Sequence, residues 1–245
     1  MKTTLVLLAS LFSLSALSSP VELPGENYAL SDVAEMGLTK ENLFRQMNRT
    51  HIKLGSSICA NRAHMWAYDF KRFHNLDSGK LFLFYTPKTG QRERNSWWYH
   101  VTPVISESNT VYAMDAGFSY IRGPLLVNEW LEKFTRSKNC HEIKDDETHL
   151  IEKMFTGATF PATTSSGTFD CYYRIVPAGY QFPGSVAKHL LGRNAQGTPV
   201  RFERPEILAR EVRSACLEAA TTGLGRLLGG GNNKCDEYMN LTQPQ

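Results

Sequence analysis

The sequence lacks the marks of a membrane protein or a nucleic-acid-binding protein. Beyond residue 20 it contains no uninterrupted apolar run of the about 18 residues that a membrane-spanning helix needs. Its formal net charge is only +3, and its lysines and arginines are scattered along the chain. Nucleic-acid-binding proteins usually gather their basic residues on one face. We therefore expect neither a membrane nor a nucleic acid among its partners.

Patterns that would predict a metal or phosphate site are also missing. The chain has no Cys-x-x-Cys pair, and its histidines do not stand at ligand intervals beside its cysteines. The glycine-rich stretch 223–231 lacks the Gly-Lys-Ser/Thr ending of a phosphate-binding loop. We predict no metal and no other cofactor.

The N-terminus has the pattern of a secretory signal peptide. Lys2 supplies the positive charge, residues 5–17 form the apolar segment, and Ala16-Leu17-Ser18 provides the cleavage positions. We expect cleavage after Ser18, so the mature protein is predicted to be secreted or periplasmic.

The chain contains five cysteines, and an exported chain with an odd number keeps one thiol after full pairing. Four of them form two couples that are local in sequence, Cys140 with Cys171 and Cys216 with Cys235. This is the simplest of the three connectivities open to four cysteines, and the sequence does not decide among them. The cysteine most naturally left unpaired is Cys59.

Cys59 stands where a loop is predicted to turn into a helix. Ser56 or Ser57 is the expected N-cap, and an apolar pattern typical of a helix runs from residue 58 to residue 75. A thiol in the first turn lies near unpaired backbone N–H groups and the positive end of the helix dipole, which favour the thiolate. The alternative is that Cys59 is a small, buried and inert apolar residue.

Two predicted strands carry a histidine and an aspartate that can serve a nucleophilic cysteine, which needs a base and a group that orients the base. Residues 97–105 and 110–116 are rich in β-branched and aromatic residues, and residues 106–109 form a turn of hairpin length. In a simple register His100 lies opposite Asp115. A slip of one residue would turn them to different faces. Each also has an ordinary interpretation, His100 as a hydrogen-bonded strand histidine and Asp115 as a turn residue.

Periodicity and capping patterns predict the remaining elements. They are helices at 40–47, 126–136 and 204–226, strands at 80–86 and 171–176, and a charged, partly helical stretch at 140–155; residues 177–200 resist assignment. His64 is predicted to be either a core or a surface residue. The other histidines, at positions 51, 74, 141, 149 and 189, are predicted to be solvated.

Three blocks of these residues resemble a known family. Residues 59–64 (CANRAH), 98–104 (WYHVTPV) and 112–115 (YAMD) are similar to the motif blocks of the bacterial protein-glutaminases, also called protein-glutamine deamidases. The resemblance covers about residues 55–130, and the chain departs from it at Thr102 and Ala116, where the family commonly has alanine and proline. It implies an α+β fold with a transglutaminase-like, papain-related core. In such a core the nucleophile at a helix N-terminus packs on an antiparallel sheet that carries the histidine and the aspartate.

By that resemblance Cys59 is the nucleophile, His100 the general base and then acid, and Asp115 the orienting carboxylate. The thiolate attacks a glutamine side-chain amide, backbone N–H groups stabilise the oxyanion, ammonia leaves, and water hydrolyses the thioester to glutamate. The substrate is expected to be a protein or peptide with an exposed glutamine. The residues predicted to contact it are Ser57, Trp97 and Trp98.

The resulting prediction is an exported, monomeric protein-glutamine deamidase. Its organisation is a signal peptide (1–18), a lead-in segment (19–54), a catalytic core (55–136) and a disulfide-stapled C-terminal extension of the same domain (137–245). The alternatives are a transglutaminase or thiol peptidase on the same fold, and a non-catalytic, disulfide-rich binding module.

Overall fold

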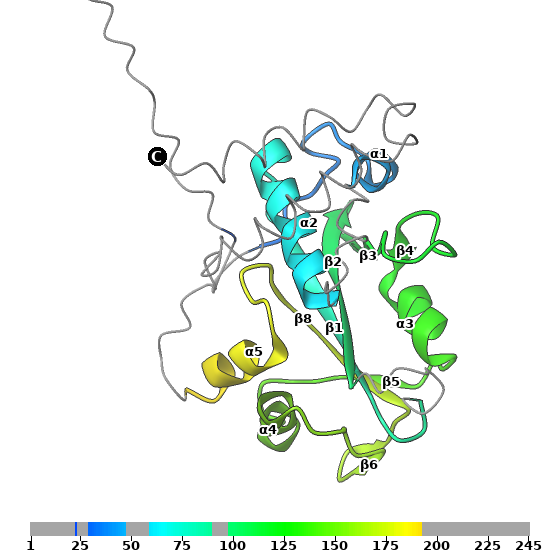
Figure 1. Cartoon of the computed structure of the whole chain (residues 1–245), viewed down its shortest axis with the longest axis vertical. Coiled ribbons are helices and arrows are strands. Elements are labelled where there is room, and N and C mark those ends of the chain that lie inside the picture. Colours follow the sequence, from blue (N-terminus) through cyan, green and yellow to red (C-terminus); the bar gives the residue numbers. More distant parts are fainter. Residues whose placement is uncertain (1–22, 24–28, 48–58, 90–97, 193–245) are drawn as a thin grey trace, which may run out of the picture.

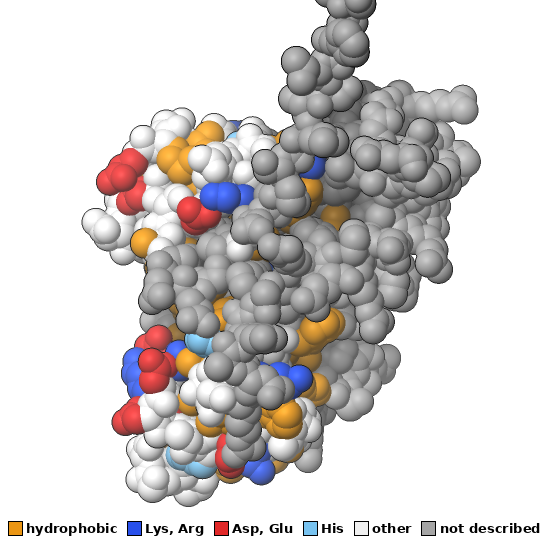
Figure 2. All heavy atoms as spheres, turned by 90° about the vertical axis from the view of Figure 1, so that its left-hand side faces the viewer, with side chains coloured by type: hydrophobic (Ala, Val, Ile, Leu, Met, Phe, Trp, Pro, Cys, Tyr) orange, Lys and Arg blue, Asp and Glu red, His pale blue; other side chains and the backbone are white. Residues whose placement is uncertain are grey.

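The computed structural model describes residues 23, 29–47, 59–89 and 98–192 of the chain. Outside these residues lie the predicted signal peptide, the caps Ser56 and Ser57, Trp97, the helix at 204–226, and Cys216 and Cys235. On the described part of one face, Figure 2 shows basic and acidic side chains interspersed with hydrophobic ones. Within the described ranges, no helix has both the length and the apolar character needed to cross a membrane.

A mixed sheet of six strands forms the centre of the described structure (Figure 1). In spatial order the strands are β4 (Leu125–Leu126), β3 (Thr110–Ala113), β2 (Tyr99–Glu107), β1 (Gly79–Tyr85), β8 (Cys171–Pro177) and β5 (Cys140–Glu142). Neighbouring strands are antiparallel except β5 and β8, which are parallel. The predicted antiparallel sheet is therefore wrong at this edge. The chain reaches β8 through a crossover that contains a helix, which is how parallel neighbours are connected.

In the described ranges five helices pack around this sheet: α1 (Lys40–Gln46), α2 (Cys59–His74), α3 (Val127–Thr135), α4 (Thr148–Thr156) and α5 (Pro183–Leu190). Figure 1 shows α3 on one side of the sheet and α4 and α5 on the other. The predicted α+β class is confirmed, and α1, α2 and α3 begin and end within one residue of their predicted bounds. The two short strands β6 (Thr163–Thr164) and β7 (Gly167–Thr168) form a separate hairpin, and α5 lies in the stretch that resisted assignment.

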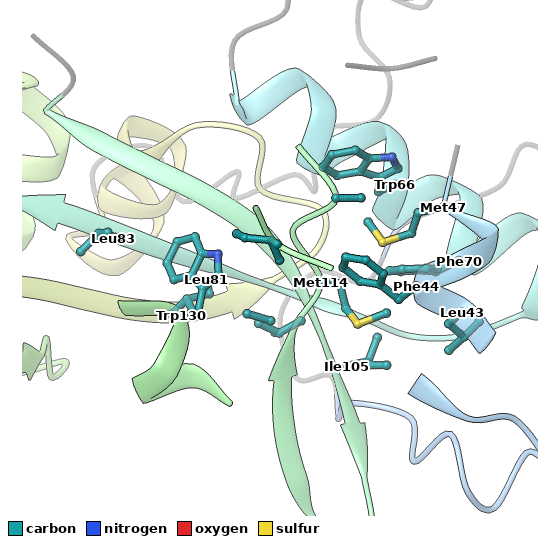
Figure 3. Packing of buried hydrophobic residues seen from close by; sticks show 14 of the residues in the cluster. Leu43, Phe44, Met47, Trp66, Phe70, Leu81, Leu83, Ile105, Met114 and Trp130 are labelled. Carbon is teal, nitrogen blue, oxygen red and sulfur yellow. The ribbon is translucent and has the colours of Figure 1, made fainter. Parts of the chain in front are cut away.

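The central strand β1 is buried along its whole length because it lies between β2 and β8. Its side chains alternate between two hydrophobic clusters, as the pleat of a strand requires. Leu81 and Leu83 join the cluster that contains Trp130 (Figure 3). Phe82 joins a second cluster that contains Cys59. The start of helix α2 contributes side chains to the second cluster, and later turns of the helix contribute Trp66 and Phe70 to the first.

The hairpin of β2 and β3 has a shorter turn than the sequence predicts. Glu107 pairs with Thr110, so the turn consists of the two residues between them, both with positive φ (51° and 62°). Such a turn matches the right-handed twist of the strands. Ile105 consequently faces Tyr112 rather than Thr110. This displacement by two residues leaves every side chain on its predicted face, because strand side chains alternate with a period of two.

The disulfide predicted between Cys140 and Cys171 is present. It joins the first residues of β5 and β8, which are paired in the sheet. Strand β8 in turn lies directly beside β1. The stretch after residue 136 therefore supplies two strands of the same sheet that carries His100.

A buried polar pair lies between α2 and β1. Lys80 Nζ is 2.7 Å from His64 Nδ1 and donates a hydrogen bond to Tyr180 O at 2.8 Å. The Lys80 and His64 side chains are both fully buried. Burial lowers the pKa of Lys80 well below its usual range, and burial together with the charge of Lys80 lowers the pKa of His64. His64 is thus a core residue, one of the two positions predicted for it.

Candidate active site

Cys59 is the first residue of α2 and, among the described cysteines, the one outside a disulfide. Its side chain is 7% exposed and belongs to the same cluster as Ala60, Ala63 and Phe82. Because alanine side chains are small, the start of α2 can lie close against the sheet. The thiol is therefore held at a helix N-terminus, as the sequence predicts, with little freedom to move.

His100 and Asp115 meet in the interior. His100 Nε2 lies 2.9 Å from Asp115 Oδ2, and the two side chains are 1% and 2% exposed. The predicted contact is confirmed. The predicted strand 110–116 is nevertheless too long, because β3 ends at Ala113 and Asp115 lies in the following turn. The sheet carries the histidine, whereas the loop that leaves it carries the aspartate.

The Asp115 carboxylate is fixed at both oxygens. Oδ2 also accepts a hydrogen bond from the Trp130 indole N–H at 3.1 Å, and Oδ1 accepts one from the Gly117 backbone N–H at 3.0 Å. Arg62, one helical turn after Cys59, lies beside this loop. A Cβ on Gly117 would stand 3.0 Å from Asp115 Oδ1 and 3.4 Å from Arg62 Nε. Glycine therefore allows the loop to close tightly around the carboxylate.

Aromatic rings surround the His100 imidazole. The Trp130 ring stacks on it with centroids 5.3 Å apart and an interplanar angle of 17°, and the Phe134 ring lies at 4.6 Å. Phe118, from the loop after Asp115, presents its edge at 5.4 Å. These apolar rings keep water away from the imidazole, and a low local dielectric strengthens its remaining polar contacts.

The pKa of His100 is raised to about 9. Burial lowers the pKa of His100, but the hydrogen bond and negative charge of Asp115, together with the neighbouring Cys59 side chain, outweigh the effect of burial. Because Nε2 is bonded to Asp115, Nδ1 is the ring nitrogen left to exchange a proton with the thiol. The structure thus places the three residues predicted as catalytic in one buried site.

Trp98, which the sequence predicts to contact the substrate, is half-buried against the cluster that contains Cys59. Its ring stacks on Phe84 at 6.0 Å and meets the ring of Tyr99 edge-on at 4.6 Å. Burial and, to a smaller extent, the charge of Cys59 raise the pKa of Tyr99. Tyr99 is therefore a further neighbour of the thiol that the sequence does not predict. Ser57 and Trp97 lie outside the described residues.

His141 differs from its prediction. Its Nε2 lies 2.8 Å from Glu147 Oε1, its ring stacks on Phe169 at 4.4 Å, and its side chain is 22% exposed. The prediction of a solvated histidine is wrong, because the ring packs between a carboxylate and an aromatic side chain. In the part of the chain that the structure describes, no group of three or more His, Cys, Asp or Glu side chains is placed to hold a metal ion.

Residues 39–134 match the model of a family described as a glutaminase. The match runs from the residue that caps α1 into α3 and includes Cys59, His100, Asp115 and Trp130. It confirms the resemblance to the protein-glutamine deamidases that the three motif blocks indicate, and it supports the deamidation of glutamine as the general chemistry. No curated protein and no solved structure matches the chain.

Proposed function

We propose that this protein is an exported, cysteine-dependent protein-glutamine deamidase with a transglutaminase-like, papain-related core. Cys59 acts as the nucleophile, His100 as the acid and base, and Asp115 as the group that orients the imidazole. The observation that supports this proposal most is the buried His100–Asp115 pair, whose pKa the neighbouring Cys59 influences, inside the stretch that matches a glutaminase family.

In the first half-reaction, the Cys59 thiolate attacks the side-chain carbonyl carbon of a glutamine. His100 accepts the proton of the thiol, so the attacking species is a thiolate–imidazolium pair. Backbone N–H groups at the start of α2 stabilise the oxyanion that forms on the carbonyl oxygen. His100 then donates its proton to the amide nitrogen, the C–N bond breaks, ammonia leaves, and a thioester remains on Cys59.

In the second half-reaction, water attacks the thioester carbonyl while neutral His100 accepts a proton from it. The C–S bond breaks, glutamate is released, and the thiolate–imidazolium pair is restored. The sum is glutamine plus water giving glutamate plus ammonia. Asp115 keeps the ring oriented in both half-reactions, since its Oδ2 remains bonded to Nε2 while Nδ1 exchanges protons.

Ammonia release tests this proposal. Wild-type protein, Cys59→Ser and His100→Ala are incubated with a glutamine-rich protein, and the substrate is then mapped by peptide mass spectrometry. The expected result is ammonia and new glutamates with the wild type, and neither with the two variants.

The other outcomes identify the alternatives. New N-termini in place of ammonia would show a thiol peptidase, and glutamine–lysine cross-links would show a transglutaminase. A protein without turnover, whose Cys59 does not react with iodoacetamide in the native state, would be the non-catalytic binding module.

We also propose export after removal of residues 1–18, a lead-in segment at 19–54, a catalytic core at 55–136 and a C-terminal extension at 137–245. The Cys140–Cys171 disulfide supports an oxidising compartment. The mature protein acts as a monomer on a protein or peptide with an exposed glutamine, with Ser57, Trp97 and Trp98 at the substrate groove. N-terminal sequencing of protein collected outside the producing cytoplasm should find Ser19 first, and a chain that still begins at Met1 would contradict export by cleavage.

A further inference from the structure

Trp130 contacts both members of the His100–Asp115 pair. Its Nε1 donates to Asp115 Oδ2 at 3.1 Å, and the same oxygen lies 2.9 Å from His100 Nε2. Its ring stacks on the imidazole at 5.3 Å and 17°, and its side chain is fully buried. The residue comes from α3, which Figure 1 shows on the side of the sheet opposite to α4 and α5, and Figure 3 shows its side chain among those of the hydrophobic cluster.

The two hydrogen bonds of Asp115 outside the pair define the plane of its carboxylate. A carboxylate can rotate about its bond to Cβ and exchange its oxygens, so a single bond to a histidine does not fix it. Here the Gly117 N–H holds Oδ1 and the Trp130 N–H holds Oδ2. Hydrogen bonds to an ionised acceptor are among the stronger ones in proteins. Oδ2 is thus kept in line with His100 Nε2.

The stacked ring fixes the second member of the pair. The indole covers one face of the imidazole, and Phe134 and Phe118 cover other sides. The ring of His100 therefore cannot turn without displacing well-packed aromatic groups. Since Nε2 is held by Asp115, the orientation of Nδ1 follows from the same contacts.

We propose that Trp130 is a positioning residue of this site. Its N–H fixes the Asp115 oxygen that binds His100, and its ring fixes the imidazole, so that Nδ1 stays directed at the Cys59 thiol. The catalytic consequence rests on the proposed deamidase function, but the positioning itself is a property of the His100–Asp115 pair and is measurable without substrate.

The charged and titratable groups around the pair come from three elements. Cys59 and Arg62 belong to α2, with Arg62 beside the loop that holds Asp115 Oδ1. Asp115 follows β3, and Tyr99 precedes His100 on β2. Helix α3 contributes the rings of Trp130 and Phe134. A change at Trp130 therefore reaches the pKa of His100 through Asp115.

The test compares Trp130→Phe with Trp66→Phe. Trp66 is a matched control because it is a buried tryptophan of the same hydrophobic cluster, from α2. Two quantities are measured on the full mature chain: the pKa of His100, from NMR of histidine-labelled protein without substrate, and the pH profile of kcat/KM for glutamine deamidation. Melting temperatures are recorded for both variants.

We expect Trp130→Phe to lower the pKa of His100 and to move the alkaline limb of the activity profile to lower pH by the same amount. The reason is that an unfixed carboxylate bonds less well to the imidazolium. At neutral pH kcat should fall about tenfold or more, the typical effect of losing one hydrogen bond to a charged group, with KM little changed. Trp66→Phe should lower the melting temperature without moving the pKa of His100 or the alkaline limb of the activity profile.

An unchanged pKa of His100 and an unchanged alkaline limb in Trp130→Phe, with only a lower melting temperature, would overturn the proposal in favour of a purely structural tryptophan. A higher pKa would also overturn it, since it would show that the indole competes with His100 for Oδ2. If Trp130→Phe does not fold, 3-benzothienylalanine at position 130 removes only the N–H. A lowered pKa of His100 in that protein supports the proposal, and an unchanged or higher pKa overturns it. A shifted pKa in a protein that never deamidates glutamine would refute the proposed function and leave the positioning role intact.

Discussion

Raising the pH from about 6 to about 10 should remove the contribution of His100 to the free energy of unfolding. Unfolded histidine has a pKa of about 6.5, whereas folded His100 has a pKa of about 9. The folded state therefore binds the proton more tightly. The stabilisation is fully present below the unfolded pKa and is lost as the pH rises through the folded one.

The size of this effect follows from the two pKa values. At about 1.4 kcal/mol per pKa unit, the rise from 6.5 to about 9 corresponds to about 3 kcal/mol. Solvent screening does not reduce this figure appreciably, because His100 is 1% exposed. A loss of this size is a large fraction of the stability of a typical domain.

Urea-induced unfolding at a series of pH values measures this contribution. The free energy of unfolding of the wild type minus that of His100→Gln should fall by about 3 kcal/mol as the pH rises from about 6 to about 10. His100→Gln is the reference because glutamine does not titrate and still offers an N–H to Asp115. The same comparison in the Cys59→Ala background, with and without His100→Gln, should show a smaller fall, since Cys59 is one of the two side chains that raise the pKa of His100. A difference that does not depend on pH would refute the reasoning.

Three further predictions concern the surroundings of the site. Gly117→Ala should lower kcat/KM at least about tenfold with a smaller effect on the melting temperature, because its Cβ would stand 3.0 Å from Asp115 Oδ1 and displace the carboxylate; steady-state kinetics and thermal unfolding check this. Replacing Cys140 and Cys171 with alanine should lower the free energy of unfolding by about 4 kcal/mol, the value for a loop with a sequence separation of 31, as measured with urea. The wild type should gain stability relative to Lys80→Met as the pH rises from neutral toward the usual lysine pKa, because burial lowers the pKa of Lys80 and the unfolded chain binds the extra proton; a constant difference in urea unfolding between neutral and alkaline pH would contradict a lowered pKa of Lys80.

Local patterns in the sequence predict much of the site. The start of α2 at Cys59 follows from an apolar repeat preceded by serines, and the disulfide between Cys140 and Cys171 is part of the simplest of the three connectivities that the sequence leaves open. The contact of His100 with Asp115 follows from two strand patterns and a short connection, although the turn is shorter than predicted. The displacement of two residues preserves the face of His100, and the loop that leaves β3 brings Asp115 to it.

The remaining features depend on contacts between distant parts of the chain. Trp130 looks like an ordinary member of an apolar helix stripe, and nothing in its local pattern shows that its N–H meets Asp115. Lys80 opens a strand pattern where a lysine usually points to solvent, yet β8 packs beside β1 and buries it. The parallel pairing of β5 and β8 likewise depends on a crossover, which local periodicity does not encode.

Trapping the acyl intermediate tests most directly the claim that Cys59 is the nucleophile. Wild-type protein is mixed with an excess of a glutamine-containing peptide, quenched in acid within the first turnover, digested and examined by mass spectrometry. The mechanism predicts that the fragment with Cys59 carries the substrate peptide less one ammonia, and that Cys59→Ala forms neither this adduct nor glutamate. Glutamate formation by Cys59→Ala at the wild-type rate, or an adduct on a different residue, would contradict it.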